Sequence, residues 1–217
     1  PDRKSKLLVA KGSFEAMGGA ERDLIRTLPA LNQLFEVKVA TIHISPELTN
    51  VCQNEGIELL HPEKKWNLPK GVISTILDRG TDTASIAWQN IPRIREYLLE
   101  SDAIHLVSGD GSLPLINHIP EEKIVHLYLL EPHRGLYEDT LHRRVDGSPK
   151  QNIFITNLLL SRARKRDQKL LNSLIKRKNS KFSGNSKFST DRANTVYGID
   201  AEILWPCVDI SEFPSND

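Results

Sequence analysis

Short apolar runs alternate with amphipathic stretches along most of this chain. Apolar runs of about four to eight residues are typical of strands that are buried on both faces of a sheet. They predict strands at residues 7–10, 35–42, 57–60, 103–107, 123–130, 181–184 and 202–204. Apolar residues with helical spacing predict helices between these strands, at residues 20–31, 47–54, 86–99, 153–179 and 189–197.

Strands that alternate with helices indicate βαβ units and a parallel sheet. We therefore predict an α/β fold, with a Rossmann-like, doubly wound and mostly parallel sheet. Residues 66–83 have weak periodicity and contain Pro69, Gly71 and Gly80, so we expect a loop with a short helix there. The stretch from residue 153 to 179 could form one helix or two.

Polar and glycine-rich loops follow three of the predicted strands, where open parallel sheets bind ligands. In the first, residues 11–21, Gly18 and Gly19 open a predicted helix. They could let the backbone approach an anion, or they could simply form a tight turn. The spacing matches neither G-x-G-x-x-G nor G-x-x-x-x-G-K-S/T, so nothing supports a dinucleotide dehydrogenase or a P-loop enzyme.

The other two loops carry further candidate site residues. Asp110 lies in the loop 108–112, which could also be a plain turn that Ser112 caps. The loop after the strand 123–130 gathers a carboxylate, an imidazole, a guanidinium and a phenol, and such convergence indicates a site. These candidates are Glu131, His133, Arg134 and Tyr137. By contrast, His105 and His126 lie within apolar strands, and we interpret them as packed core histidines.

Charge is balanced overall but not locally. The 29 lysines and arginines against 28 acidic residues give a net charge of +1, which predicts no polyanionic partner. Residues 161–181 nevertheless hold nine cationic residues and a single acidic one. This segment, Arg162–Lys181, follows an apolar run and could contact an anionic membrane surface, or it could be an ordinary solvated helix face. It contains no aromatic residue, so we expect no nucleic-acid partner.

Cysteine content and hydropathy bear on location. The two cysteines, Cys52 and Cys207, are too few for a disulfide framework, which fits a reducing compartment. The sequence shows neither a signal peptide nor an apolar run long enough to span a bilayer. We expect a cytoplasmic protein, either free or peripheral at the inner face of the membrane. The start at Pro1 and the polar residues 213–217 at the end lead us to expect one domain of a longer protein.

Four segments carry a resemblance to a known family. They are Met17–Arg22 (M-G-G-A-E-R), Glu131–Glu138 (E-P-H-R-G-L-Y-E), Gly184–Phe188 (G-N-S-K-F) and Tyr197–Asp209, which contains Y-G and L-W-P-C-V-D. In this order they resemble the amino-terminal domain of group 1, family 4 retaining glycosyltransferases, which have the GT-B fold. The corresponding family patterns are a G-G-A-E loop, E-P-x-R-x-L/V/W-Y/W-E/D, N-S-x-F and Y-G followed by V-x-Y-P-P-V-D. Together they extend over almost the whole chain.

The resemblance implies an enzyme of two Rossmann-like lobes. Residues 1–205 would be the lobe that mostly recognises the acceptor, and residues 206–217 would begin the interdomain linker. The carboxyl-terminal lobe, which holds the nucleotide sugar, would lie outside this chain. The full-length protein would be a hexosyltransferase whose partners are a nucleotide sugar and a sugar or lipid-linked acceptor. It would need no cofactor and no metal, and this chain alone should be inactive.

Residue roles also follow from the resemblance. Gly18 and Gly19 would lie against the donor diphosphate or the acceptor, and Glu21 would fix their loop or contact the acceptor. Many family members have a histidine directly before the Glu-Pro pair, where this sequence has Leu130. The candidate catalytic residues Glu131, His133 or Arg134 could compensate, the full-length protein could belong to a subgroup with a different sugar contact, or activity could be lost. The further candidate substrate-binding residues are Asp110 and Tyr137.

Two other interpretations remain open. The chain could be a non-catalytic, phosphate- or anion-binding Rossmann-like module that docks on anionic membranes through residues 161–181. A nicotinamide-dependent dehydrogenase is the second, and the missing G-x-G-x-x-G pattern disfavours it.

Overall fold

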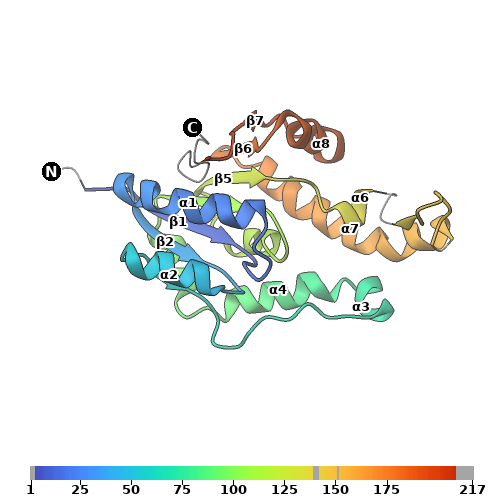
Figure 1. Ribbon diagram of the computed structural model, residues 1–217, viewed down its shortest axis with the longest axis horizontal. Coiled ribbons are helices and arrows are strands. Elements are labelled where there is room, and N and C mark those ends of the chain that lie inside the picture. The colour runs from blue at the N-terminus through green and yellow to red at the C-terminus, as the bar shows by residue number, and fades with distance from the viewer. Residues whose placement is uncertain (1–2, 139–141, 151, 209–217) are drawn as a thin grey trace, which may run out of the picture.

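The protein is an α/β domain built on one parallel sheet. Its structure, a computed structural model, describes residues 3–138, 142–150 and 152–208. In this part of the chain, seven parallel strands form a sheet of order β3-β2-β1-β4-β5-β6-β7 (Figure 1). The strands are β1 (Lys6–Lys11), β2 (Glu36–Ala40), β3 (Glu58–Leu60), β4 (Ala103–Val107), β5 (Ile124–Leu129), β6 (Ser180–Gly184) and β7 (Glu202–Ile203). The predicted fold class is confirmed.

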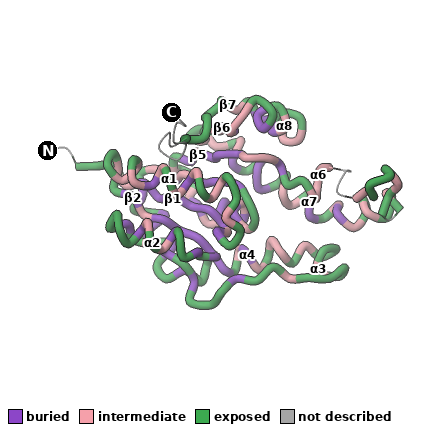
Figure 2. Tube along the Cα trace, in the orientation of Figure 1, coloured by how far each residue is buried: buried purple, intermediate pink, exposed green. Residues whose placement is uncertain are grey.

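The alternation of side chains along β1 explains why the apolar runs were visible in the sequence. Leu8 and Ala10 belong to the hydrophobic core on one face of the sheet, and Leu7 and Val9 to the core on the other face. A strand covered on both faces buries successive residues, so its sequence is almost continuously apolar. Figure 2 shows the central strands as a buried layer inside the molecule.

Helices cover both faces of the sheet. On one face lie α1 (Gly19–Leu34) and α2 (Pro46–Asn54), which contribute Leu24, Leu28 and Leu48 to the core. On the other face lie α4 (Arg79–Gln89), α5 (Ile94–Glu100), the 3-10 helix η1 (Leu113–His118), α7 (Ile153–Ile175) and α8 (Lys187–Tyr197). Two short helices, α3 (Val72–Ile76) and α6 (Arg134–Tyr137), complete the described elements. The sheet is therefore doubly wound.

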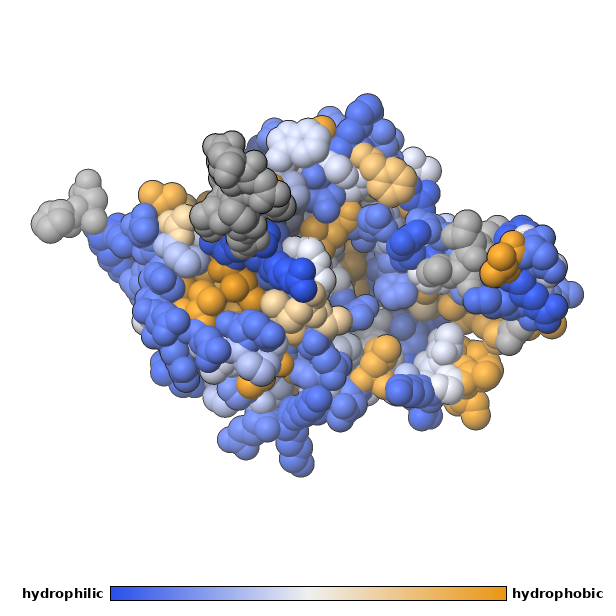
Figure 3. Space-filling model, in the orientation of Figure 1, coloured by the Kyte–Doolittle hydropathy of each residue, from blue (hydrophilic) through white to orange (hydrophobic). Residues whose placement is uncertain are grey.

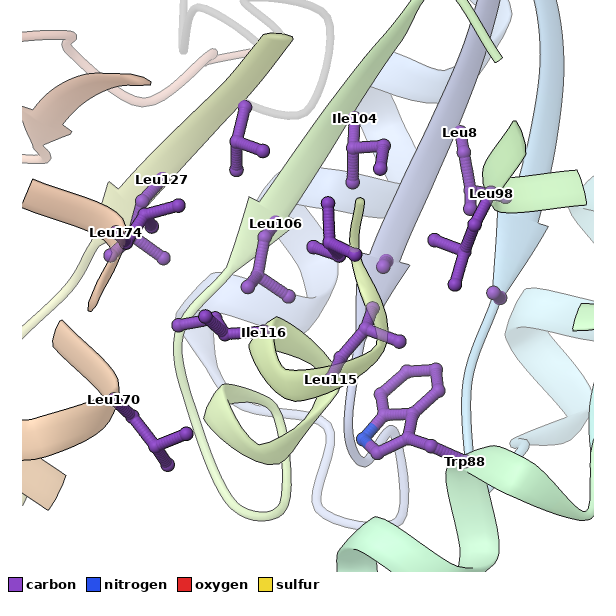
Figure 4. Close-up of a cluster of buried hydrophobic side chains, with 14 of the residues drawn as sticks. Leu8, Trp88, Leu98, Ile104, Leu106, Leu115, Ile116, Leu127, Leu170 and Leu174 are labelled. Carbon is purple, nitrogen blue, oxygen red and sulfur yellow. The ribbon is translucent and has the colours of Figure 1, made fainter. Parts of the chain in front are cut away.

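The larger core lies on the face of α4, α5 and α7. Trp88 of α4 is fully buried and points at Leu115 of η1, and Leu8, Leu106 and Leu170 belong to the same cluster (Figure 4). The indole Nε1 donates a hydrogen bond of 2.7 Å to the carbonyl of Gly111, so the one polar atom of this side chain is satisfied. Burial of each large apolar side chain stabilises the fold by about 1.5–3 kcal/mol.

The prediction for the crossover between β3 and β4 is confirmed in part. Residues 66–83, expected to be a loop with a short helix, contain the short helix α3, but α4 already begins at Arg79 within this region. The single helix expected at 86–99 is interrupted after Gln89 and resumes at Ile94. Pro92 disfavours helical geometry at the residue before it, and Arg93 adopts a left-handed conformation with φ 58°. The two helices can therefore pack separately on the core.

Other expectations concern the second half of the chain. Residues 153–175 form one long helix rather than two, and α8 begins at Lys187 with Ser186 as its N-cap. Most of the expected linker, residues 209–217, lies outside the described residues, as does Asp209 of the last motif. None of the described helices is long and apolar enough to cross a membrane.

Candidate functional site

The sheet topology selects one place on the carboxyl edge, the edge at which the parallel strands end. β1 and β4 are neighbours, although β2 and β3 come between them in the sequence. The chain leaves β1 toward β2 on one side and returns to β4 on the other side. The carboxyl ends of β1 and β4 therefore form the topological switch point, where open α/β sheets bind ligands. The loops 12–18 and 108–112 lie there.

The two loops are in backbone contact at Gly12. A Cβ atom on Gly12 would lie 2.1 Å from the carbonyl oxygen of Asp110, a separation that no real Cβ could have. The N–H of Gly12 donates a hydrogen bond of 2.8 Å to Oγ of Ser112, which is fully buried. Ser112 was considered as a helix N-cap, but its side chain makes no capping hydrogen bond to η1. Its hydroxyl instead joins the loop after β4 to the loop after β1.

A buried ion pair fixes the first loop. Lys11, the last residue of β1, has a side chain only 2% exposed, and its Nζ lies 2.8 Å from Oε1 of Glu21. The other carboxylate oxygen of Glu21 accepts the N–H of Gly18 at 3.0 Å. Lys11 also donates to the carbonyl of Ser13 at 3.1 Å. Glu21 therefore holds the Gly18–Gly19 turn against the end of β1.

The N-terminus of α1 faces open space. A Cβ on Gly19 would meet no atom within 4 Å. The N–H groups of the first turn, from Gly19 to Glu21, have no intrahelical acceptor, because the helix has no earlier turn. The positive end of the helix dipole lies at the same place. Backbone donors and partial positive charge together can bind a phosphate or another anionic group.

The loop after β4 presents Asp110 at the same edge. Gly109 and Gly111 have φ angles of 144° and 73°, which L side chains rarely adopt, and they turn the chain so that Asp110 is exposed. The backbone of Asp110 lies against Gly12, in the loop after β1. Its exposed carboxylate could accept hydrogen bonds from the hydroxyl groups of a sugar.

The loop after β5 is joined to the same edge through Ser108. The hydroxyl of Ser108 accepts the N–H of Leu130 at 3.0 Å. The hydroxyl of Ser112 thus joins the loop after β4 to the loop after β1, and the hydroxyl of Ser108 joins the loop after β4 to the loop after β5. These two serines and Lys11 were missed as site residues by the sequence analysis. The available signal concerned Ser108 alone, which directly follows a buried strand, where a polar side chain needs a partner.

The charged residues of this third loop pair with one another. Nε of Arg134 lies 3.0 Å from Oε2 of Glu138 and 3.6 Å from Oε2 of Glu131. The hydrogen bond to Glu138 is the main reason why the pKa of Arg134 is raised. The side chain of Arg134 is nevertheless 59% exposed, and His133 is exposed beside it. Both side chains can therefore still reach a ligand.

Tyr137 has a different environment. Its hydroxyl donates a hydrogen bond of 2.7 Å to Oδ2 of Asp167, which also accepts the hydroxyl of Tyr197 at 2.7 Å. The two rings meet edge to face with centroids 5.7 Å apart. Burial raises the pKa of Asp167 and also that of Tyr137. The phenol therefore joins α6, α7 and α8, and its hydroxyl is occupied within the protein.

The two strand histidines lie away from this edge. His105 and His126 are half-buried, their Nδ1 atoms are 2.8 Å apart, and their rings stack with centroids separated by 4.9 Å. Nε2 of His126 is also hydrogen-bonded to Oγ of Ser183. Burial lowers the pKa of His105 to about 3, so its ring is neutral at physiological pH. Both histidines line an apolar cavity of about 290 Å³ between α1 and the strands, rather than the switch point.

No group of three or more His, Cys, Asp and Glu side chains suited to a metal ion occurs within the described ranges.

Comparison with known proteins agrees on the fold. No protein-family model matches the sequence, and no curated protein matches it. Among solved structures, that of HepE from Anabaena in complex with UDP and glucose is similar to 98% of this chain, with a TM-score of 0.52 and 14% sequence identity. UGT2 from Phytolacca americana, in complex with UDP-2-fluoro-glucose and pterostilbene, aligns with 97% of the chain at a TM-score of 0.49 and 10% identity.

The chain spans about half of each of these structures, 47% of HepE and 55% of UGT2. At 14% identity, the likeness to HepE establishes the Rossmann-like fold alone. The likeness to UGT2 is too distant to add to it.

Proposed function

We propose that this chain is the amino-terminal, acceptor-side half of a nucleotide-sugar-dependent glycosyltransferase with the GT-B fold. Two lines support the proposal. Four sequence segments resemble the group 1, family 4 retaining enzymes, and the fold is that of about half of HepE, whose structure holds UDP and glucose. Under this proposal, residues 1–205 form the lobe, and the lobe that binds the nucleotide sugar lies outside the chain.

The observation that carries the proposal is the arrangement at the N-terminus of α1. The N–H groups of Gly19, Ala20 and Glu21 point out of the first turn at the switch point, and nothing lies within 4 Å of the place of a Gly19 Cβ. The buried Lys11–Glu21 pair fixes this turn before any ligand binds. Donors fixed in advance stabilise a phosphate or a developing negative charge without reorganising during the reaction.

The proposed reaction transfers a hexose with retention of configuration to a sugar or lipid-linked acceptor. Stabilisation of the leaving nucleotide matters more here than a protein nucleophile, so the reaction is compatible with Leu130 in place of the family's histidine. Glu131, His133 and Arg134 are the candidates to contact the reacting sugar, because all three lie at the end of β5 and the side chains of His133 and Arg134 are exposed. Asp110 would contact sugar hydroxyls. We propose no metal and no cofactor for this step.

One observation favours a second candidate. Arg134 is paired with Glu138 and Glu131, and the hydroxyl of Tyr137 is held by Asp167. Two of the expected site groups are thus occupied by internal contacts, while the anion-binding N-terminus of α1 remains open. A non-catalytic, anion-binding Rossmann-like module would need only the open N-terminus of α1.

Nucleotide release tests the proposal and separates the two candidates. The full-length protein that contains this chain is incubated with UDP-, GDP- and ADP-sugars, and the free nucleotide is measured. Release from one of these donors is the expected result and identifies the sugar. A folded protein that binds no nucleotide would overturn the proposal in favour of the non-catalytic module.

The substitution Gly19→Val tests whether the N-terminus of α1 belongs to the active site. A β-branched side chain at this position obstructs the approach of a ligand to the backbone donors. The loss of one hydrogen bond to a charged group lowers kcat/KM by about tenfold to a hundredfold. Gln33→Val is the matched control, because it puts the same side chain at an exposed site near the other end of α1. Equal activity of the two folded variants would remove the Gly18–Gly19 turn from the site.

A further inference from the structure

Apolar side chains gather at one end of the molecule, in a surface that we call the apolar tip. It consists of Val72 and Ile73 of α3, Val145 in the turn before α7, and Phe154 and Leu158 of α7. Their exposed fractions are 65%, 67%, 109%, 77% and 64%, respectively. Helices α3 and α7 contact each other, and both extend beyond the carboxyl ends of the strands (Figure 1). Hydrophobic surface is visible at this end where α3 lies (Figure 3).

The apolar tip brings together exposed apolar side chains from three segments of the chain. Single exposed apolar side chains are common on soluble proteins, but a group of them on neighbouring elements marks an interaction site. Here three separate segments place large side chains at the same end. Helix α3 and the start of α7 also project beyond the carboxyl ends of the strands (Figure 1). An apolar surface at a projecting end of the molecule suits insertion into a soft partner.

The charge around the tip identifies the kind of partner. The segments next to the tip, 70–79, 142–150 and 153–166, hold nine lysines and arginines and two aspartates, a net charge of +7. The whole chain has a net charge of +1, so the remainder carries −6. Two aspartates, Asp78 and Asp82, are paired with Arg166 at 3.3 and 2.6 Å. The segments that form the apolar tip therefore carry a net positive charge, and the rest of the chain carries a net negative charge.

The basic segment Arg162–Lys181, considered above for membrane contact, is partly occupied by internal contacts. Arg164 donates to the carbonyl of Leu136, and Arg177 donates to the carbonyl of Pro120 at 3.1 Å. Arg166 binds Asp82 at 2.6 Å in addition to Asp78. These side chains support the packing of α7. A membrane contact would therefore centre on the tip end of α7 rather than on its whole length.

We propose that the apolar tip docks on an anionic lipid bilayer. The apolar side chains enter the boundary between headgroups and acyl chains, and the surrounding lysines and arginines bind the lipid phosphates. A second copy of this chain fits less well, because a symmetric contact through the tips would bring two positively charged ends together. The docking places the carboxyl edge of the sheet toward the membrane surface. It does not depend on the proposed enzymatic function.

Vesicle co-sedimentation tests the docking without any nucleotide. The chain is mixed with vesicles of phosphatidylcholine and phosphatidylglycerol, and with vesicles of phosphatidylcholine alone. Binding to the anionic vesicles is expected, with strong weakening in about 1 M salt because the screening length falls to about 3 Å. Phe154→Ser and Ile73→Ser each remove a large apolar group, and each should lower the partition coefficient by about tenfold.

Leu34→Ser is the matched control. Leu34 is 69% exposed, comparable to Ile73, but it lies at the C-terminal end of α1, at the opposite end of the molecule (Figure 1). Its replacement should leave vesicle binding unchanged. The proposal is overturned if the wild-type chain does not bind anionic vesicles, or if Leu34→Ser weakens binding as much as Phe154→Ser. It is also overturned if Phe154→Ser abolishes a dimer seen by gel filtration and has no effect on vesicle binding.

Discussion

Two glycines at the switch point differ in the space around their α-carbons. Gly12 lies in contact with the loop after β4, where a Cβ would be 2.1 Å from the carbonyl oxygen of Asp110 and 2.6 Å from the nitrogen of Ser112. Around Gly19 the same atom would meet nothing within 4 Å. The first glycine is therefore needed for the two loops to touch, and the second leaves space for a ligand.

This difference predicts opposite effects of the same substitution. In Gly12→Ala, the new methyl group meets backbone atoms that cannot move independently, so we expect the free energy of unfolding to fall by roughly 1–3 kcal/mol or more. Gly19→Ala adds a methyl group in open space and should not destabilise the protein. Urea denaturation of both variants measures the difference. Equal midpoints and slopes would show that the loops after β1 and β4 are not in close contact.

The burial of Lys11 could not be predicted from its local sequence. In the sequence it ends an apolar run and precedes a glycine, which fits a solvated lysine at the end of a strand. In the structure it is buried and paired with Glu21, ten positions away. A buried ammonium group requires a nearby partner, because transfer from water is costly. The lysine could be identified as buried only once the helix that carries Glu21 had been placed on the sheet.

At the scale of elements, one carboxylate connects three helices. Asp167 lies on α7 and accepts hydrogen bonds from Tyr137 of α6 and Tyr197 of α8. These contacts hold the short helix α6, and with it Arg134, beside the end of β5. The E-P-H-R-G-L-Y-E segment is thus positioned by a residue that belongs to none of the four family-like motifs.

The raised pKa of Asp167 predicts a specific pH dependence. Burial raises this pKa above its ordinary value of 3.8, so the folded state favours the protonated acid. The contribution of protonated Asp167 to the free energy of unfolding is fully present below pH 3.8 and is lost as the pH rises through the raised pKa. Asp167→Asn resembles the protonated acid at every pH. The Tm of this variant relative to the wild type should therefore increase as the pH rises and then level off.

Thermal unfolding of both proteins across the acid range checks this prediction. The comparison with Asp167→Asn removes the contribution of the other carboxylates, which titrate equally in both proteins. A difference in Tm that stays constant with pH would show that the environment of Asp167 leaves its pKa unchanged.

Some elements could be predicted from local sequence and others could not. β1, β4 and β5 were predicted because each is a short apolar run buried on both faces. The crossover from residue 72 to 100 was predicted only in part, because its helices are short and interrupted at Pro92. Packing around Trp88, rather than helical periodicity, determines where α4 and α5 lie.

At the scale of the whole molecule, we propose that this chain is one half of a two-lobed enzyme. Because we propose that the donor-binding lobe lies outside this chain, the chain alone should release no nucleotide from any nucleotide sugar. Assay of the isolated chain beside the full-length protein, with the same donors, measures this. Turnover by the chain alone at the rate of the full-length protein would contradict the proposal that the donor-binding lobe lies outside this chain.

The sequence by itself determined the α/β class, the order of the strands along the chain and the three loops that end β1, β4 and β5. These depend on hydrophobic periodicity and on turn residues, which act over a few neighbouring positions. Only the tertiary structure decided which groups meet. Ser112 joins Gly12 across 100 positions, Tyr137 is held by Asp167, and the exposed residues of α3 and α7 share one end of the molecule. Such contacts form between segments far apart in the chain, and packing of the whole sheet brings them together.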